Sequence, residues 1–205
     1  MQHLTGRSSS GADPRRYRAA VDSSRAQALI FDFDGTMVDS DAALVAPFVA
    51  LGVPEDEISF GHAIAEECER LGIPMDRYVE LYDDTAVMPF PGMAEVVPRL
   101  GRWALCSNKH PTSGLSELRR LGWGPEVALF ADHFGWAHKS IAPVLEFLDL
   151  SAHEVVMVGD SAGDVRCASE VGCRYVWAGW NPRVAAHRPA GTVLADPSEL
   201  LDLIG

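Results

Sequence analysis

The sequence predicts an α/β fold, a doubly wound parallel sheet with a small helical insert after the first strand. Short apolar segments rich in β-branched and aromatic residues alternate with amphipathic helical patterns, which is typical of strands joined by crossover helices. The segments are apolar almost throughout, as expected for parallel strands covered on both faces. Roughly fifty residues after the first segment carry helical patterns and no convincing strand. These observations place an insert inside an otherwise regular α/β domain.

Each predicted element has its own sequence signal. Short apolar runs bounded by turn residues predict six strands, at 28–33, 102–107, 127–130, 154–159, 174–179 and 192–195. Amphipathic periodicity predicts four helices between them, at 92–100, 112–121, 140–149 and 163–172, and a last one after the final strand, near 198–204.

The chain divides into an extension, a core and an insert. Residues 1–27 carry five Arg against two Asp, without long apolar periodicity, and we expect a flexible N-terminal extension. Their Arg-rich, Ser-rich composition also fits an organellar transit peptide. Residues 28–38 and 89–205 form the predicted α/β core, and residues 39–88 form the predicted small helical cap.

Composition excludes several classes of function. The 205 residues carry a formal net charge of −12, whereas proteins that bind nucleic acid rely on clustered cations. The sequence contains no apolar run long enough to span a bilayer and no signal-peptide core. Its four cysteines show no metal-binding spacing. We therefore expect a cytoplasmic protein with no nucleic-acid or membrane partner, with organellar import left open and the oligomeric state undetermined.

Two aspartates stand at the end of the first predicted strand. Asp32 and Asp34 stand two positions apart, and Gly35 then allows the backbone to turn. Two neighbouring carboxylates repel each other, and a bound divalent cation relieves that repulsion. An EF-hand is excluded because the twelfth position of such a loop is Ala43 rather than Glu.

Polar residues also follow the later strands. Ser107 and Asn108 end the second strand, and Ser107 suits either a phosphoryl contact or a helix cap. The chain contains 15 Arg but only two Lys, Lys109 and Lys139, both near predicted strand ends. A compact ammonium suits a crowded phosphate pocket.

The fourth strand ends in a further pair of acids, Asp160 and Asp164. These residues suit a helix N-cap, and they also suit a cation shared with Asp32. Because ligands bind at the carboxyl ends of strands in such sheets, we expect the side chains of all these strand ends to converge.

The order of these motifs, IFDFDGTMVDS, LCSNK, Lys139 and VMVGDSAGD, resembles the haloacid dehalogenase-like hydrolase superfamily. The match spans residues 28–179, and within the superfamily it is most similar to phosphoglycolate phosphatase-like enzymes. The resemblance implies a Rossmann-like core and a phosphatase that hydrolyses a small phosphorylated metabolite. It also implies an aspartyl-phosphate intermediate and a Mg²⁺ cofactor.

The resemblance further implies a role for each matched residue. Asp32 is the nucleophile, and Asp34 is the acid that protonates the leaving oxygen and then activates water. The Mg²⁺ ligands are Asp32, the carbonyl oxygen of Asp34, Asp160 and, directly or through water, Asp164. The phosphate group is held by the backbone after Asp32, at Gly35 and Thr36, and by Ser107, Asn108 and Lys139.

Two departures from the family pattern bear on these roles. The family's lysine is usually followed at once by proline, whereas Lys139 is followed by Ser140. Residues 39–88 hold twelve acids against two cations, Arg70 and Arg77, so the cap is poorly suited to a polyanion. We therefore expect a small monophosphate with a neutral or cationic leaving group, and slow turnover of phosphoglycolate.

Other functions stay open at this point. A phosphomutase of the β-phosphoglucomutase type would pass the phosphoryl group to a sugar, although a cap this small is less suited to excluding water. From a different class, a phospho-accepting signalling module or a non-hydrolytic binding protein would use similar residues. A receiver domain, however, has its acceptor on a middle strand and no helical insert after the first.

Overall fold

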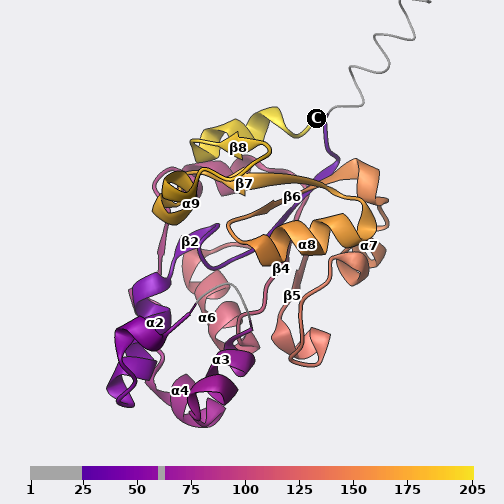
Figure 1. The fold of residues 1–205 in the computed structure, drawn as a ribbon. Helices are drawn as coiled ribbons and strands as arrows, with labels where there is room; N and C mark the ends of the chain where they lie inside the picture. The colour runs from indigo at the N-terminus through magenta and orange to yellow at the C-terminus, as the bar shows by residue number, and fades with distance from the viewer. Residues whose placement is uncertain (1–24, 60–62) are drawn as a thin grey trace, which may run out of the picture.

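The computed structural model describes residues 25–59 and 63–205, and a six-stranded parallel sheet lies at its centre (Figure 1). The strand order is β5-β4-β1-β6-β7-β8. The strands are β1 (Ala28–Phe31), β4 (Trp103–Cys106), β5 (Val127–Leu129), β6 (Val155–Gly159), β7 (Arg174–Ala178) and β8 (Val193–Leu194). Since the order runs outward from β1 in both directions, the predicted doubly wound sheet is confirmed, with its topological switch point beside β1.

The sheet is buried on both faces, and alternate residues of β1 face different layers. Leu29 pairs with Trp103 of β4 and with Val156 of β6. Leu29 and Phe31 belong to one apolar cluster, while Ala28 and Ile30 belong to the other. This explains why the strand is apolar at every position.

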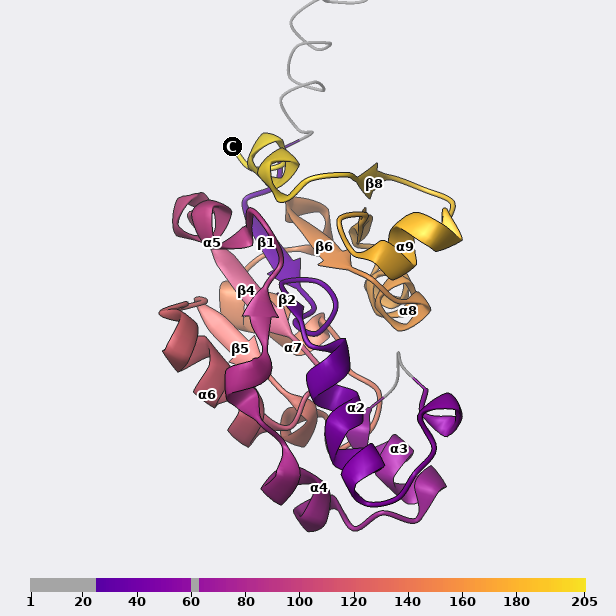
Figure 2. The same cartoon turned by 90° about the vertical axis from the view of Figure 1, so that its left-hand side faces the viewer.

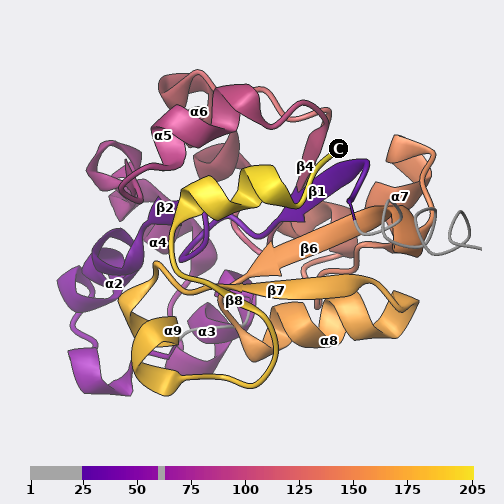
Figure 3. The same ribbon diagram turned by 90° about the horizontal axis from the view of Figure 1, so that it is seen from above.

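Helices cover both faces (Figure 3). One layer contains α5, η3, α6 and η6, and the other contains α7 and α8. The bounds are α5 (Met93–Val96), η3 (Val97–Arg99), α6 (Pro111–Leu121), η4 (Ala131–Phe134), α7 (Ala142–Leu148), η5 (Ala152–Glu154), α8 (Ala162–Val171), α9 (Pro182–His187) and η6 (Pro197–Asp202).

Three of these segments differ from the sequence prediction. The helix expected at 92–100 is split into α5 and a 3-10 turn, since Pro98 lacks the N–H that a continuing α-helix requires. The last helix is a 3-10 helix. Helix α9 was not predicted, although its start carries a recognisable signal: the Asn181 side chain accepts a hydrogen bond from the Arg183 amide, and Pro182 occupies the first turn.

The insert has its own small core. Phe48, Cys68 and Tyr78 form an apolar cluster separate from the two clusters of the sheet, with the rings of Phe48 and Tyr78 4.7 Å apart. Its elements are α2 (Asp41–Ala50), η1 (Glu55–Glu57), α3 (Ile64–Leu71), α4 (Met75–Leu81) and η2 (Asp84–Ala86). Figure 2 shows α2, α3 and α4 beyond the end at which β1 stops.

Two short strands join the insert to the core. Strand β2 (Val38–Asp39) pairs antiparallel with β3 (Met88–Pro89). The sequence prediction did not include them, because two residues are too few to show a periodic pattern.

The N-terminal extension lies largely outside the described residues, which begin at Arg25. Ala26 is buried and pairs with Ile204. Within the part of the chain that the structure describes, no helix is both long and apolar enough to cross a membrane.

Candidate active site

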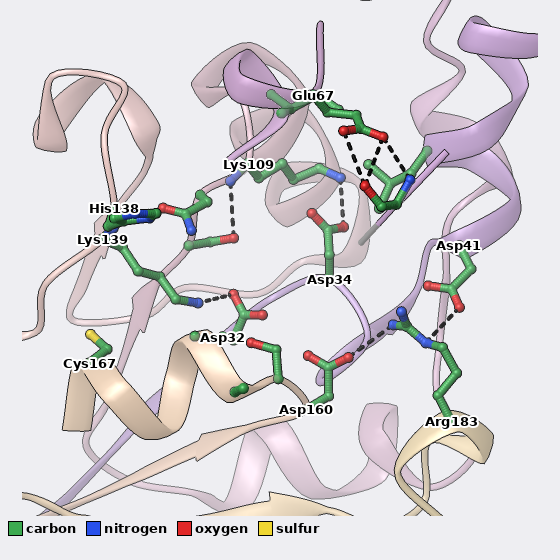
Figure 4. Close-up of a pocket in the computed structure, with 18 of the residues that line it drawn as sticks. Asp32, Asp34, Asp41, Glu67, Lys109, His138, Lys139, Asp160, Cys167 and Arg183 are labelled. Atoms are coloured by element: carbon green, nitrogen blue, oxygen red, sulfur yellow. Dashed lines mark hydrogen bonds and ion pairs between the residues drawn. The ribbon is translucent and has the colours of Figure 1, made fainter. Parts of the chain in front are cut away.

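A cavity of about 510 Å³ lies between the carboxyl ends of the strands and the insert (Figure 4). Its core side is polar, and its insert side is formed largely by apolar and aromatic residues. The residues predicted from the strand ends that line it are Asp32, Asp34, Ser107, Asn108, Lys139 and Asp160.

Asp32 stands directly after β1, at the centre of the sheet. Its amide donates a hydrogen bond to the carbonyl of Val158 in β6 (3.0 Å), which continues the strand pairing to this residue. Its carboxylate lies 2.6 Å from the Lys139 ammonium. Burial raises the pKa of Asp32 to about 6, although the Lys139 charge opposes this rise. Asp32 is therefore a buried carboxylate that a neighbouring cation helps to keep charged.

The turn after β1 brings Gly35 against Asp160. Gly35 has a φ of +75°, and a Cβ added there would lie 2.3 Å from Asp160 Oδ2. The neighbouring Thr36 hydroxyl lies 3.4 Å from Asp160 Oδ1. The Asn181 side-chain Nδ2 donates a hydrogen bond to the Gly35 carbonyl at 2.7 Å. Only glycine fits this conformation and this close approach.

The acids after β6 form the start of helix α8. Asp164 Oδ2 accepts hydrogen bonds from the amides of Asp160 and Ser161, and the Ser161 hydroxyl caps the Asp164 amide in return. The other Asp164 oxygen lies 2.6 Å from the Lys139 ammonium. The segment can therefore cap α8 and also serve the site, because the N-cap hydrogen bonds of α8 orient Asp164.

Asp32, Asp160 and Asp164 form a cluster suited to a cation. One carboxylate oxygen from each lies within 4.8 Å of the others. Burial, together with the charges of Asp32 and Asp164, raises the pKa of Asp160 well above its usual value. Hard oxygen ligands in a repulsive, buried group are what Mg²⁺ would stabilise, so this donor set fits that ion.

The three side chains predicted to bind phosphate, Ser107, Asn108 and Lys139, line the same cavity as Asp32 and Asp160. Ser107 is buried, and its hydroxyl accepts a hydrogen bond from the Lys109 amide (3.3 Å). The Asn108 side-chain oxygen accepts from the Lys139 amide at 3.0 Å. Burial disfavours the Lys139 charge, but Asp164 and Asp32 outweigh it and hold its pKa well above the usual value. Lys139 is therefore a permanent cation at the site.

Several residues at the site were not assigned a role from the sequence. Lys109 donates to Asp34 at 2.8 Å, and it also contacts Tyr82 of the insert and Glu117 of α6. The scarcity of lysine already pointed to Lys109, but no local pattern pointed to Tyr82 or Glu117, because their contacts depend on the tertiary fold.

Arg183 is another residue at the site that was not assigned a role from the sequence, and it connects the core to the insert. Its guanidinium lies 2.9 Å from Asp160 and 3.0 Å from Asp41 at the start of α2. It follows the Asn-Pro cap of α9, a helix that the sequence did not predict.

Comparison with protein-family models identifies the chain. Residues 51–178, more than half of the sequence, match the model for haloacid dehalogenase-like hydrolases. The chain belongs to the haloacid dehalogenase-like hydrolase family. The matched range of this hydrolase contains Ser107, Lys139, Asp160 and Asp164, whereas Asp32 precedes it.

Two curated relatives of this haloacid dehalogenase-like hydrolase are named phosphatases. It is 26% identical over 179 residues to a phosphoglycolate phosphatase from Mesorhizobium japonicum, covering 70% of this chain and 78% of that protein. It is 22% identical over 218 residues to an N-acetylmuramic acid 6-phosphate phosphatase from Pseudomonas aeruginosa, covering 88% and 95%.

Solved structures confirm the fold. A haloacid dehalogenase-superfamily hydrolase from Geobacter sulfurreducens aligns with a TM-score of 0.63 at 22% identity, covering 88% of this chain and 97% of that chain.

Proposed function

We propose that this hydrolase is a Mg²⁺-dependent phosphatase that cleaves small-molecule phosphate monoesters through an aspartyl-phosphate on Asp32. The observation that carries the proposal is the convergence of Asp32, Asp160 and Asp164 beside Lys139, at the core side of the cavity that Asp32, Asp160 and Lys139 line. Both curated relatives act, by name, on phosphorylated compounds of low molecular mass.

Asp32 and Asp34 divide the chemistry between them. Asp32 is the nucleophile: one carboxylate oxygen forms a bond to phosphorus as the ester P–O bond breaks. Asp34 gives its proton to the departing oxygen, and it then takes a proton from the water that hydrolyses the aspartyl-phosphate. The two residues reach the cavity from the same turn, so one short segment presents both groups.

The phosphate oxygens are held by the groups around Asp32. The Lys139 ammonium and the Ser107 hydroxyl neutralise and donate to the phosphate, together with the backbone at Gly35 and Thr36. Asn108 acts through Lys139, because its side chain holds the Lys139 amide.

Asp32, Asp160 and the Asp34 carbonyl would hold the Mg²⁺ ion. Asp164 would act through a water molecule, since its oxygens already contact Lys139 and the start of α8. When bound, the ion offsets the repulsion between the carboxylate nucleophile and an anionic substrate.

We further propose that residues 39–88 act as a cap domain over a core of residues 28–38 and 89–205, and that the cap selects the leaving group. Its wall of the cavity includes Leu44, Phe48 and Tyr78, with the buried carboxylate of Glu67 among them. The two cap arginines are paired with Glu67 and Glu80, and neither is among the described residues that line the cavity. This wall suits a neutral or cationic leaving group rather than an anionic one.

A substrate screen tests this selectivity. Neutral sugar phosphates and amino-sugar phosphates should be hydrolysed with a higher kcat/KM than phosphoglycolate, whose carboxylate meets no cation among the described cap residues that line the cavity. A screen with phosphoglycolate far ahead of the neutral sugar phosphates would overturn the assignment of the leaving group.

The mechanism itself is tested with 4-nitrophenyl phosphate. Phosphate release should require Mg²⁺ and should fall by several orders of magnitude in Asp32→Asn, because no other group can replace the nucleophile. Asp132→Asn, which changes an exposed acid outside the cavity, is the matched control and should keep wild-type activity. Wild-type activity in Asp32→Asn would show that the nucleophile is misassigned.

A further inference from the structure

Lys109 is a buried cation with three partners. Only 2% of its side chain is exposed. Its ammonium lies 2.8 Å from Asp34 Oδ1, 2.7 Å from the Tyr82 hydroxyl and 3.1 Å from Glu117 Oε1. It also lies 4.7 Å from the centre of the Tyr82 ring. An ammonium has three N–H donors, and these three partners match that number.

Glu117 fixes the position of that ammonium from the core. Its side chain is fully buried on α6, and Oε1 accepts a hydrogen bond from the Tyr82 hydroxyl at 2.8 Å as well as contacting Lys109. Its other oxygen has no hydrogen-bond partner within the described residues. A buried carboxylate is costly unless a cation is close by. Glu117 therefore keeps Lys109 inside the protein, beside Asp34.

Tyr82 brings the cap into the same group. It immediately follows α4, and it packs against both the core cluster and the cap cluster. Its hydroxyl accepts from Lys109 and donates to Glu117. A movement of the cap relative to the core would therefore break the hydrogen bond from Lys109 to Tyr82 and the one from Tyr82 to Glu117.

We infer that Lys109, anchored by Glu117 and Tyr82, is a positioning residue for Asp34 that makes proton donation to the leaving group depend on the position of the cap. This inference rests on the proposed phosphatase function. The hydrogen bond from the Lys109 ammonium to Asp34 Oδ1, 2.8 Å long, fixes the direction in which the Asp34 carboxyl faces the cavity. A carboxyl held in one direction presents its proton to the leaving oxygen in a defined geometry.

The dependence of rate on the leaving group measures this role. The more acidic 4-nitrophenol departs readily as its anion, without a proton. The less acidic phenol is a poorer leaving group and needs the proton from Asp34. Phenyl phosphate and 4-nitrophenyl phosphate differ in this respect and share a ring of similar size. Their kcat/KM values report the steps up to departure of the phenol, before the aspartyl-phosphate is hydrolysed.

In Lys109→Met, kcat/KM for phenyl phosphate should fall about tenfold further than kcat/KM for 4-nitrophenyl phosphate, a part of what general acid catalysis contributes. In an Asp34→Asn background the same change should have no effect on this ratio, because the proton donor is already gone. Arg102→Met is the matched control: it removes an exposed cation paired with Glu126, outside the cavity, and should leave both rates unchanged.

Tyr82→Phe provides a milder second variant, since it removes one hydroxyl and keeps the ring. It should shift the ratio of the two kcat/KM values in the same direction by a smaller factor. If Lys109→Met does not fold, Tyr82→Phe tests the inference in its place. An equal loss for both substrates, or an unchanged ratio, in the variant that folds would overturn the inference. Absence of phosphate release by the wild type would instead count against the proposed function.

Discussion

Gly35 shows how a single residue without a side chain sets the geometry of the site. It turns the chain after β1 with a positive φ and lets the backbone approach the Asp160 carboxylate. A methyl group there would meet both Asp160 and Arg183, at 2.3 and 2.8 Å. The sequence identified this position as a turn, but only the fold shows what lies against it.

Gly35→Ala should therefore lose activity and stability together. We expect a loss of about 1–3 kcal/mol in the free energy of unfolding from backbone strain, with a further loss from the contact with Asp160. Urea unfolding and phosphate release measure the two effects.

Gly72→Ala is the matched control for that variant. Gly72 has a similar φ, +68°, but nothing lies within 4 Å of an added Cβ. The Gly72→Ala substitution should lower the free energy of unfolding by about 1 kcal/mol and leave activity unchanged. If both variants lose equal stability and keep activity, the approach of Gly35 to Asp160 is unimportant.

Helix α6 carries a buried acid that links stability to pH. Burial raises the pKa of Glu117 from 4.5 to about 7, although Lys109 opposes the rise. The folded state thus holds a proton on Glu117 at pH values where the unfolded chain has released it. The contribution of this residue to stability is largest below pH 4.5, and it decreases as the pH rises toward 7.

Glu117→Gln should flatten this pH dependence, since glutamine carries no titratable proton. Between pH 5 and pH 8 the wild type should lose about 2 kcal/mol more of its free energy of unfolding than the variant does. Urea unfolding at the two pH values provides the measurement. Glu95→Gln, which changes an exposed glutamate on α5, should follow the wild type. Equal losses in wild type and Glu117→Gln would contradict the account of this helix.

The elements were predictable to different degrees. The six strands of the sheet are apolar except for Arg174 at the start of β7, so short apolar runs bounded by turn residues located them. Helix α9 and the strands β2 and β3 were not predicted, because segments of two to six residues are too short to show a period.

At the scale of the whole molecule, topology explains why the site could be predicted in part. Parallel strands end at one edge of a sheet, so the sequence alone groups Asp32, Ser107 and Asp160. The side chains that reach the site from the middle of α6 and from the cap follow no such rule. The contacts of Glu117 and Tyr82 with Lys109 therefore had no signal in the sequence.

The central claim is that carboxylates from the ends of β1 and β6 together hold one divalent cation. Isothermal titration calorimetry with Mg²⁺ tests it most directly, on the wild type and on Asp160→Asn. The wild type should bind one ion per chain, and Asp160→Asn should lose that binding while its unfolding transition remains cooperative. A wild type that binds no Mg²⁺, or an Asp160→Asn variant that binds it as the wild type does, would contradict the account.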